Sequence, residues 1–196
     1  PDEYTLNYFF KAVNEKIGEV IPSKEWSDDK SIDWADKDYS KDKRKFRKNK
    51  GYEWLKGGKS EGKILGGCLP VILHLAGTEY WPDFKGKILL LETPEGDNFK
   101  KGETLANVDS ALGDLRNLNV FKQIKSIIFG RGFGYSDEEI KKLKDIILYN
   151  TRDYNFPILY GADIGHTDPL IIIPLGVNCE IDSKRNLFSI NENGVY

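Results

Sequence analysis

The chain has 196 residues, of which 39% are hydrophobic and 31% charged, enough for one domain, or at most two small ones, with a sizeable core. Its formal charge of −2 excludes a global basic field that would attract nucleic acid or an anionic membrane. No apolar run approaches the ~20 residues that span a bilayer, the N-terminus lacks a signal-peptide core, and two cysteines form no C-x-x-C motif. We therefore expect a cytoplasmic protein. Because the sequence contains no methionine, Pro1 is not expected to be a native start, and a longer parent chain is expected.

The first segment, residues 1–20, is expected to be an N-terminal helix and linker. Over residues 4–17 the apolar side chains recur at helical spacing, which predicts a short amphipathic helix. These side chains are Leu6, Phe9, Phe10, Val13 and Ile17.

Residues 21–50 lose this periodic pattern and form a polar insert. The insert ends in residues 41–50, where seven basic residues and one acid are typical of a solvated, mobile loop. It also contains Trp26 and Trp34, and tryptophan is costly to leave in water. Both indoles are therefore expected to pack on the domain, on a partner or on a ligand.

Residues 51–196 are expected to form one mixed α/β domain, because apolar runs bounded by glycine alternate with segments of helical periodicity. A Gly57-Gly58 turn separates the first two strands. The expected strands are 52–56, 61–65, 86–92, 126–129, 157–161, 170–175, 179–182 and 187–190. The expected helices are 69–77, 103–118 and 137–149.

Glu92 and His166 are the two residues whose positions favour acid–base chemistry. Glu92 ends an apolar strand, at the edge where α/β sheets carry functional groups, although an acid there can simply terminate a strand. His166 follows an apolar strand in the segment GADIGH, whose glycines allow close approach of the backbone. A plain loop histidine is the alternative for His166. His74 lies within an apolar helix and is expected to be a packed or surface residue.

The sequence offers no convincing nucleophile to complete such a site. Ser136 follows Gly-Tyr, as an active-site serine can, but a capping box with Glu139 explains it better, because its hydroxyl is needed at the Glu139 amide. Cys68 follows two glycines at a predicted helix start. That position either lowers its thiol pKa or places a small buried residue at a tight turn.

Taken together, a set of motifs resembles the C-terminal domain of the LD-carboxypeptidase family of serine peptidases. This family includes murein tetrapeptide carboxypeptidases and the microcin C self-immunity peptidases, and the tryptophan-bearing insert is more similar to the second branch. In chain order the motifs are GGCL (66–69), HLAGTEYWP (74–82), GKILLLE (86–92), IIFGR (127–131), GADIGH (161–166) and IPLG (173–176).

The resemblance implies a mixed β/α swivelling domain that forms the C-terminal half of a two-domain serine peptidase. Its Ser-Glu-His triad would be split, with Glu92 as the acid and His166 as the general base. The serine would belong to an N-terminal Rossmann-like domain that this chain lacks and would need as its partner. Ser136 is then a decoy, because the family's serine precedes both other members. We expect the isolated chain to be inactive.

The resemblance further implies hydrolysis of an amide in a peptidyl-nucleotide of microcin C type or in murein tetrapeptide. Trp26 and Trp34 resemble aromatic positions that stack a nucleobase in the microcin branch. Cys68 is assigned to substrate binding as well, but it stands where the family commonly has an asparagine after the paired glycines, and if that asparagine holds substrate, its contribution is in doubt here. We expect no cofactor and no metal, and leave homodimerisation open. The alternative function is a non-catalytic ligand-binding or interaction domain, which an upstream half carrying a nucleophilic serine would exclude.

Overall fold

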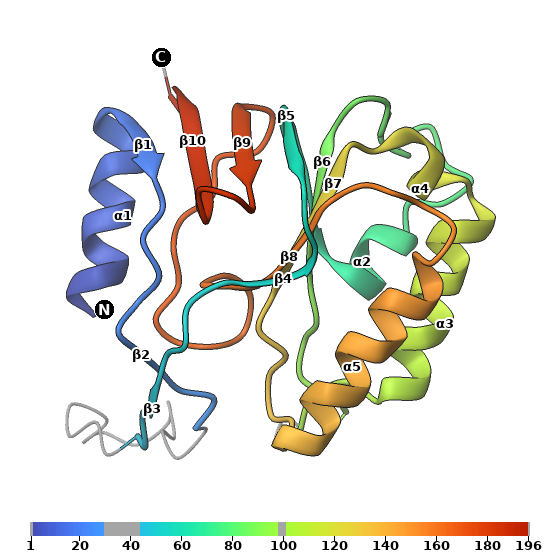
Figure 1. Cartoon of the computed structure of the whole chain (residues 1–196), viewed down its shortest axis with the longest axis horizontal. Coiled ribbons are helices and arrows are strands. Elements are labelled where there is room, and N and C mark those ends of the chain that lie inside the picture. The colour runs from blue at the N-terminus through green and yellow to red at the C-terminus, as the bar shows by residue number, and fades with distance from the viewer. Residues whose placement is uncertain (1, 30–43, 98–100, 196) are drawn as a thin grey trace.

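The computed structural model describes residues 2–29, 44–97 and 101–195 of the chain. Five helices and ten strands are present in this described part (Figure 1). In chain order they are α1 (Glu3–Asn14), β1 (Lys16–Glu19), β2 (Glu25–Trp26), β3 (Arg47–Lys48), β4 (Glu53–Lys56), β5 (Lys59–Cys68), α2 (Leu69–Leu73), β6 (Ile88–Glu92), α3 (Leu105–Asn117), α4 (Val120–Gln123), β7 (Ser126–Gly130), α5 (Asp137–Asn150), β8 (Ile158–Ala162), β9 (Asn178–Asp182) and β10 (Leu187–Asn193).

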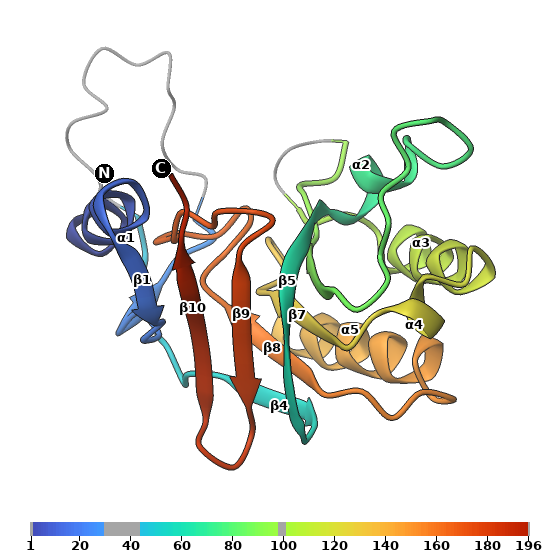
Figure 2. The same ribbon diagram turned by 90° about the horizontal axis from the view of Figure 1, so that it is seen from above.

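Eight of the strands form one mixed sheet in the order β1-β10-β9-β5-β6-β7-β8-β4. β5, β6, β7 and β8 are parallel, whereas the remaining neighbours pair antiparallel. Helices α2 to α5 lie on one side of the parallel strands, and α1 lies at the far side beside β1 and β10 (Figure 2). The expected mixed α/β class is confirmed.

Two apolar cores form on the two faces of the parallel strands, because successive side chains of a strand point to opposite faces. In β6, Leu89 and Leu91 join the core under the helices, whereas Ile88 and Leu90 face the core covered by β9, β10 and α1. All four are buried, and each such side chain contributes about 1.5–3 kcal/mol to stability. Burial on both faces explains why this strand is a continuous apolar run.

The sheet curls, because β4 and β5 are consecutive in the chain yet four places apart in the strand order. Only Gly57 and Gly58 connect them. The two glycines lie between the expected strands but form no hairpin turn, because the strands do not pair with each other: β4 pairs with β8, and β5 pairs with β6 and β9. The curl brings the far edge of the parallel strands back to the start of β5.

The predicted N-terminal helix is confirmed, but its apolar stripe is exposed. Tyr8 and Ala12 are the buried residues of α1, on the side that faces the sheet. Tyr8 accepts a hydrogen bond from the Ile21 amide at 2.8 Å, which holds this side inward. Ile17 is buried, but as part of β1. The exposed side chains are Leu6, Phe9, Phe10 and Val13.

The strand expected over 170–175 is wrong. This segment forms an irregular loop between β8 and β9. Pro169 and Pro174 lack the amide hydrogen that a sheet ladder requires. The Ile171 amide donates instead to the Asp163 carbonyl within the same loop, at 2.8 Å. Within this unpaired run Ile171 is buried, whereas Ile172 and Leu175 are exposed.

The two described ends of the polar insert meet in a small separate sheet. β2 and β3 pair antiparallel, with Glu25 opposite Lys48 and Trp26 opposite Arg47. Residues 30–43 lie outside the described residues, and Trp34 is among them. The end of the segment that precedes the insert, residues 16–19, is part of the main sheet, because β1 pairs with β10.

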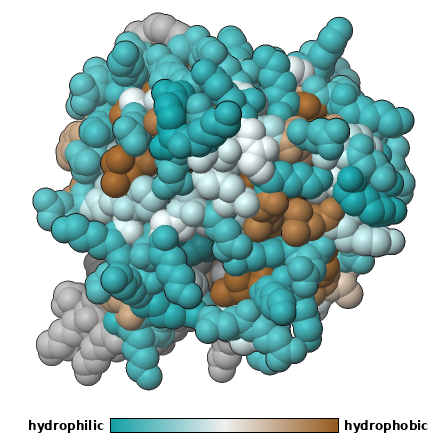
Figure 3. All heavy atoms as spheres, in the orientation of Figure 1, coloured by the Kyte–Doolittle hydropathy of each residue, from teal (hydrophilic) through white to brown (hydrophobic). Residues whose placement is uncertain are grey.

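The face drawn in Figure 3 is mainly hydrophilic, with several separate apolar areas, as is usual for the surface of a globular domain. Among the described residues, no helix has both the length and the apolar character needed to cross a membrane.

Candidate functional site

Glu92 and His166 meet at the carboxyl ends of the parallel strands. Glu92 is the last residue of β6, and His166 is the fourth residue after β8. The imidazole Nδ1 lies 2.7 Å from the Glu92 carboxylate Oε2, although the two residues are 74 positions apart. The hydrogen-bonding distance expected for an acid–base pair is therefore confirmed. The Glu92 side chain is 9% exposed, and that of His166 is 32% exposed, so the ring remains accessible.

Glycine at position 165 allows this contact. Gly165 has φ +88°, in the left-handed region, and a Cβ built there would lie 2.6 Å from Glu92 Oε2. A side chain would therefore be strained by the backbone and would also collide with the carboxylate. The close approach expected from the glycines of GADIGH is the approach of this backbone to Glu92.

Glu95 is a second carboxylate at the imidazole, and sequence reasoning missed it. Its Oε2 lies 3.2 Å from His166 Nε2, on the other side of the ring from Glu92. The signal was present in the sequence, because Glu95 follows Glu92 by three residues in the segment Glu-Thr-Pro-Glu. An imidazole donates to both carboxylates only when both nitrogens are protonated. In the neutral ring with its proton on Nδ1, the Nε2 lone pair is a base.

Cys68 lies beside Glu92, because β5 and β6 pair in parallel with these two residues in register. The thiol is partly buried, and burial together with the nearby Glu92 carboxylate raises its pKa to about 12. The possibility of a lowered pKa is therefore wrong: Cys68 precedes a five-residue helix but has a negative charge as its neighbour. Gly66 allows the two strands to approach, since a Cβ there would lie 1.8 Å from the Leu90 carbonyl oxygen.

Comparison with known proteins identifies the family of the chain. The family model of the LD-carboxypeptidase C-terminal domain matches residues 61–181, more than half of the chain. The chain belongs to the LD-carboxypeptidase family. The resemblance stated from the sequence is confirmed, and the matched residues contain Cys68, Glu92 and His166.

Relatives within this family include carboxypeptidase-like and immunity proteins. A putative carboxypeptidase of Bacillus subtilis, YocD, is 31% identical over 92% of this chain and 52% of its own length. The microcin C7 self-immunity protein MccF of Escherichia coli is 28% identical over 97% of this chain and 54% of its own length. The chain thus spans about half the length of these relatives.

A solved structure of MccF in complex with glutamyl sulfamoyl guanosine has the same fold. It superposes with a TM-score of 0.82 at 26% identity, over 97% of this chain and 56% of that chain. The expected fold of the family's C-terminal domain is therefore confirmed.

Trp26, one of the two aromatic candidates of the insert, is anchored on the family domain. The residue is 9% exposed. Its ring lies 4.3 Å from the guanidinium carbon of Arg47 and 5.2 Å from that of Arg131, distances at which cation–π attraction operates. Trp34 lies outside the described residues.

Ser136 caps a helix as the sequence indicated, and His74 is at the surface, but the helix expected over 69–77 ends at Leu73, so His74 is not within it. The Ser136 hydroxyl accepts from the Glu139 amide at 3.3 Å, and the Ser136 amide donates to the Glu139 carboxylate at 2.8 Å, which completes the capping box of α5. His74 is the exposed C-cap residue of α2.

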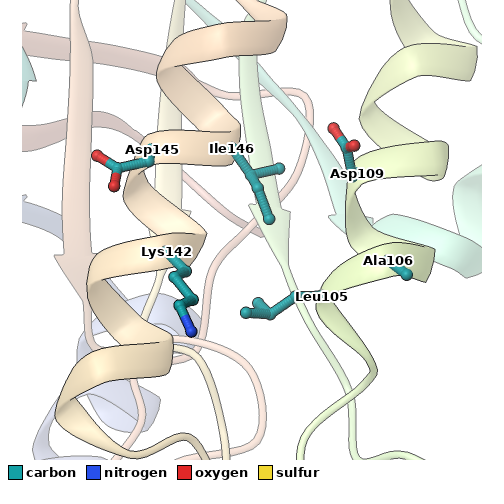
Figure 4. A pocket seen from close by; sticks show the side chains of 6 residues that line it. All are labelled: Leu105, Ala106, Asp109, Lys142, Asp145 and Ile146. Atoms are coloured by element: carbon teal, nitrogen blue, oxygen red, sulfur yellow. The ribbon is translucent and has the colours of Figure 1, made fainter.

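A cavity of about 360 Å³ lies elsewhere, between α3 and α5 (Figure 4). None of its six lining residues belongs to the candidate site. They are Leu105, Ala106, Asp109, Lys142, Asp145 and Ile146. Across the described part of the chain, no group of three or more His, Cys, Asp or Glu side chains is arranged to hold a metal ion.

Proposed function

We propose that this chain is the acid–base half of a serine-type peptidase that hydrolyses an amide bond. The observation that carries the proposal is the 2.7 Å contact between His166 Nδ1 and Glu92 Oε2 at the carboxyl ends of the parallel strands. A buried carboxylate on one nitrogen of a partly exposed imidazole is the arrangement that a general base requires.

In the proposed mechanism, the nucleophilic serine comes from an N-terminal half of the parent protein. Its hydroxyl proton moves to His166 Nε2 as its oxygen attacks the carbonyl carbon of the scissile amide. The Glu92 carboxylate accepts a hydrogen bond from Nδ1–H and stabilises the imidazolium without taking the proton. The imidazolium then gives the Nε2 proton to the leaving amine, and water hydrolyses the acyl-enzyme by the same route.

The Glu95 carboxylate must move away from His166 Nε2 for this reaction to proceed. Its carboxylate lies 3.2 Å from the nitrogen that the serine hydroxyl would approach. We infer that entry of the nucleophile displaces the Glu95 side chain and exchanges one hydrogen-bond partner of the ring for another.

A peptidyl-nucleotide is the substrate class we favour over murein tetrapeptide. The relative MccF has been solved with glutamyl sulfamoyl guanosine, and an MccF-like protein of Streptococcus pneumoniae with AMP. In this chain the insert combines aromatic side chains with the basic run 41–50, which suits a base and a phosphate. Because the Trp26 ring already contacts two guanidinium groups, Trp34 is the better candidate for stacking a base.

The acid–base assignment is tested in the parent two-domain protein with Glu92→Gln. This change keeps the side-chain shape but weakens the hold on the imidazole, and we expect kcat to fall by about 10⁴-fold. Ser136→Ala is the control and should leave kcat unchanged. Unaltered kcat in Glu92→Gln would refute the assignment. Tight substrate binding without turnover by the unmodified protein would favour the alternative of a binding domain.

The substrate class is tested with Trp34→Ala on both candidate substrates. Loss of one stacked base on an aromatic ring costs on the order of 1–3 kcal/mol, so KM for the peptidyl-nucleotide should rise roughly ten- to a hundredfold. KM for murein tetrapeptide and the melting temperature should stay unchanged. Equal losses on both substrates with a lower melting temperature would mean that Trp34 only anchors the insert.

A further inference from the structure

The loop that carries His166 starts at Asp163, whose buried carboxylate binds three other segments. The residue is 1% exposed. Asp163 Oδ2 accepts the Tyr4 hydroxyl at 2.9 Å and the Ser23 amide at 2.8 Å. Asp163 Oδ1 accepts the Ser23 hydroxyl at 2.7 Å and pairs with the Arg131 guanidinium. Four donors therefore hold one carboxylate, three residues before His166.

Arg131 connects the same loop to the sheet and to the insert. It follows β7, is 5% exposed, and donates from Nη1 to the Gly161 carbonyl at 3.0 Å while Nη2 pairs with Asp163. The guanidinium thus holds both flanks of Ala162, the last residue of β8. Its face lies 5.2 Å from the Trp26 ring of β2.

The insert binds the loop on both sides of His166. Ser23 binds Asp163 on the N-terminal side. On the C-terminal side, the Ser27 amide donates to the Asp168 carbonyl at 2.7 Å and the Asp168 amide donates to the Ser27 carbonyl at 2.9 Å. Figure 1 shows β2 close to this loop. Residues 23–27 therefore bind both ends of the short stretch that contains the imidazole.

We propose that Asp163 is a positioning residue that couples the insert to the His166–Glu92 contact. Only Ile164 and Gly165 separate it from His166, and the Gly165 backbone lies against the Glu92 carboxylate. A displacement of Asp163 therefore moves the imidazole relative to Glu92. The proposal rests on the proposed function for the catalytic role of His166, but the coupling itself is a property of this chain.

The coupling is measured in the 196-residue chain by NMR of the imidazole nitrogens, without any activity. The chain has only two histidines, so His74 at the end of α2 is an internal reference. Asp163→Asn should shift the His166 nitrogen resonances and leave those of His74 in place. The matched control is Asp182→Asn, since Asp182 is also a buried aspartate paired with an arginine, Arg185, but lies at the end of β9. Asp182→Asn should shift the nitrogen resonances of neither histidine.

Should Asp163→Asn not fold, Ser23→Ala removes a single donor to the carboxylate and should shift His166 in the same direction by less. Unchanged His166 resonances in every folded variant would overturn the coupling. In the parent two-domain enzyme, Asp163→Asn should lower kcat about a hundredfold, as expected for a misplaced catalytic group, with KM changed less than about threefold. Failure to find peptidase activity would refute the proposed function and leave the NMR result standing.

Discussion

At the scale of single residues, Gly165 is the position where the backbone itself determines the site. A side chain there meets both a left-handed φ and the Glu92 carboxylate, whereas Gly176 has a similar φ of +82° and open space around its Cβ direction. The two positions therefore separate backbone strain from steric exclusion.

We expect Gly176→Ala to lower the free energy of unfolding by about 1–2 kcal/mol, the usual cost of a left-handed non-glycine residue. Gly165→Ala should cost at least about 1 kcal/mol more, because the new methyl group also displaces Glu92. Urea unfolding of both variants measures the difference. Equal costs would mean that the carboxylate moves freely and that the close packing is unimportant.

The raised pKa of the Cys68 thiol also has a measurable consequence, the rate at which the thiol is alkylated. With a pKa raised to about 12, only roughly 10⁻⁴ of the thiol is ionised at pH 8, whereas an ordinary cysteine is substantially ionised there. Alkylation by iodoacetamide should therefore be slow at pH 8 and should accelerate about tenfold per pH unit up to pH 9.5. Cys68→Ser identifies the reacting site, since Cys179 is fully buried. A rate that levels off near pH 8.5 would contradict this prediction.

At the scale of secondary-structure elements, α5 shows how a local signal explains a serine that resembles a nucleophile. Both partners of its capping box are engaged, the Ser136 hydroxyl with the Glu139 amide and the Glu139 carboxylate with the Ser136 amide. The cap satisfies amides at the start of the helix that have no partner within it. Ser136 is thus a structural residue of α5.

Ser136→Ala should lower the free energy of unfolding by about 0.5–2 kcal/mol, the usual cost of losing an N-cap. Thr104→Ala is a matched comparison, because the Thr104 hydroxyl caps α3 by accepting from the Asn107 amide at 3.2 Å. Chemical denaturation should give losses of similar size for the two variants. A folded but inactive Ser136→Ala variant of the two-domain enzyme would identify Ser136 as the nucleophile and contradict our assignment.

At the scale of the whole molecule, the candidate site forms at one edge of a curled sheet, and the proposed mechanism requires a further group. Glu92 comes from β6 and His166 from the loop after β8, whereas the proposed mechanism assigns the serine to an N-terminal half of a longer parent protein. The relatives are about twice as long as the chain, which is consistent with a site shared between two halves.

The isolated chain should therefore hydrolyse neither a peptidyl-nucleotide nor murein tetrapeptide. Activity should appear when the N-terminal half of the parent is supplied, either covalently or as a separate polypeptide. Chromatographic detection of the released amine measures both reactions. Turnover by the isolated chain that survives His166→Ala would exclude the proposed mechanism.

The sequence by itself determined the elements whose signals are local. Continuous apolar runs predicted β6 and β7 as strands buried on both faces, and the capping box marked the start of α5. Both patterns can be read from residues that are neighbours in the sequence. Glu92 and His166 could be selected because Glu92 ends an apolar strand, His166 follows one, and parallel strands end at the same edge of a sheet. Their roles came from the family resemblance.

Only the tertiary structure decided which side chains meet across long separations. Three sets of contacts join segments far apart in the chain: Glu95 with His166, the Trp26 ring with Arg47 and Arg131, and the four donors on Asp163. The apolar run 170–175 is a further case. Pro169 and Pro174 act against strand pairing, but which of its side chains are buried depends on the segments that pack against it. Periodicity reports the conformation of a segment, whereas the curl of the sheet decides which segments it meets.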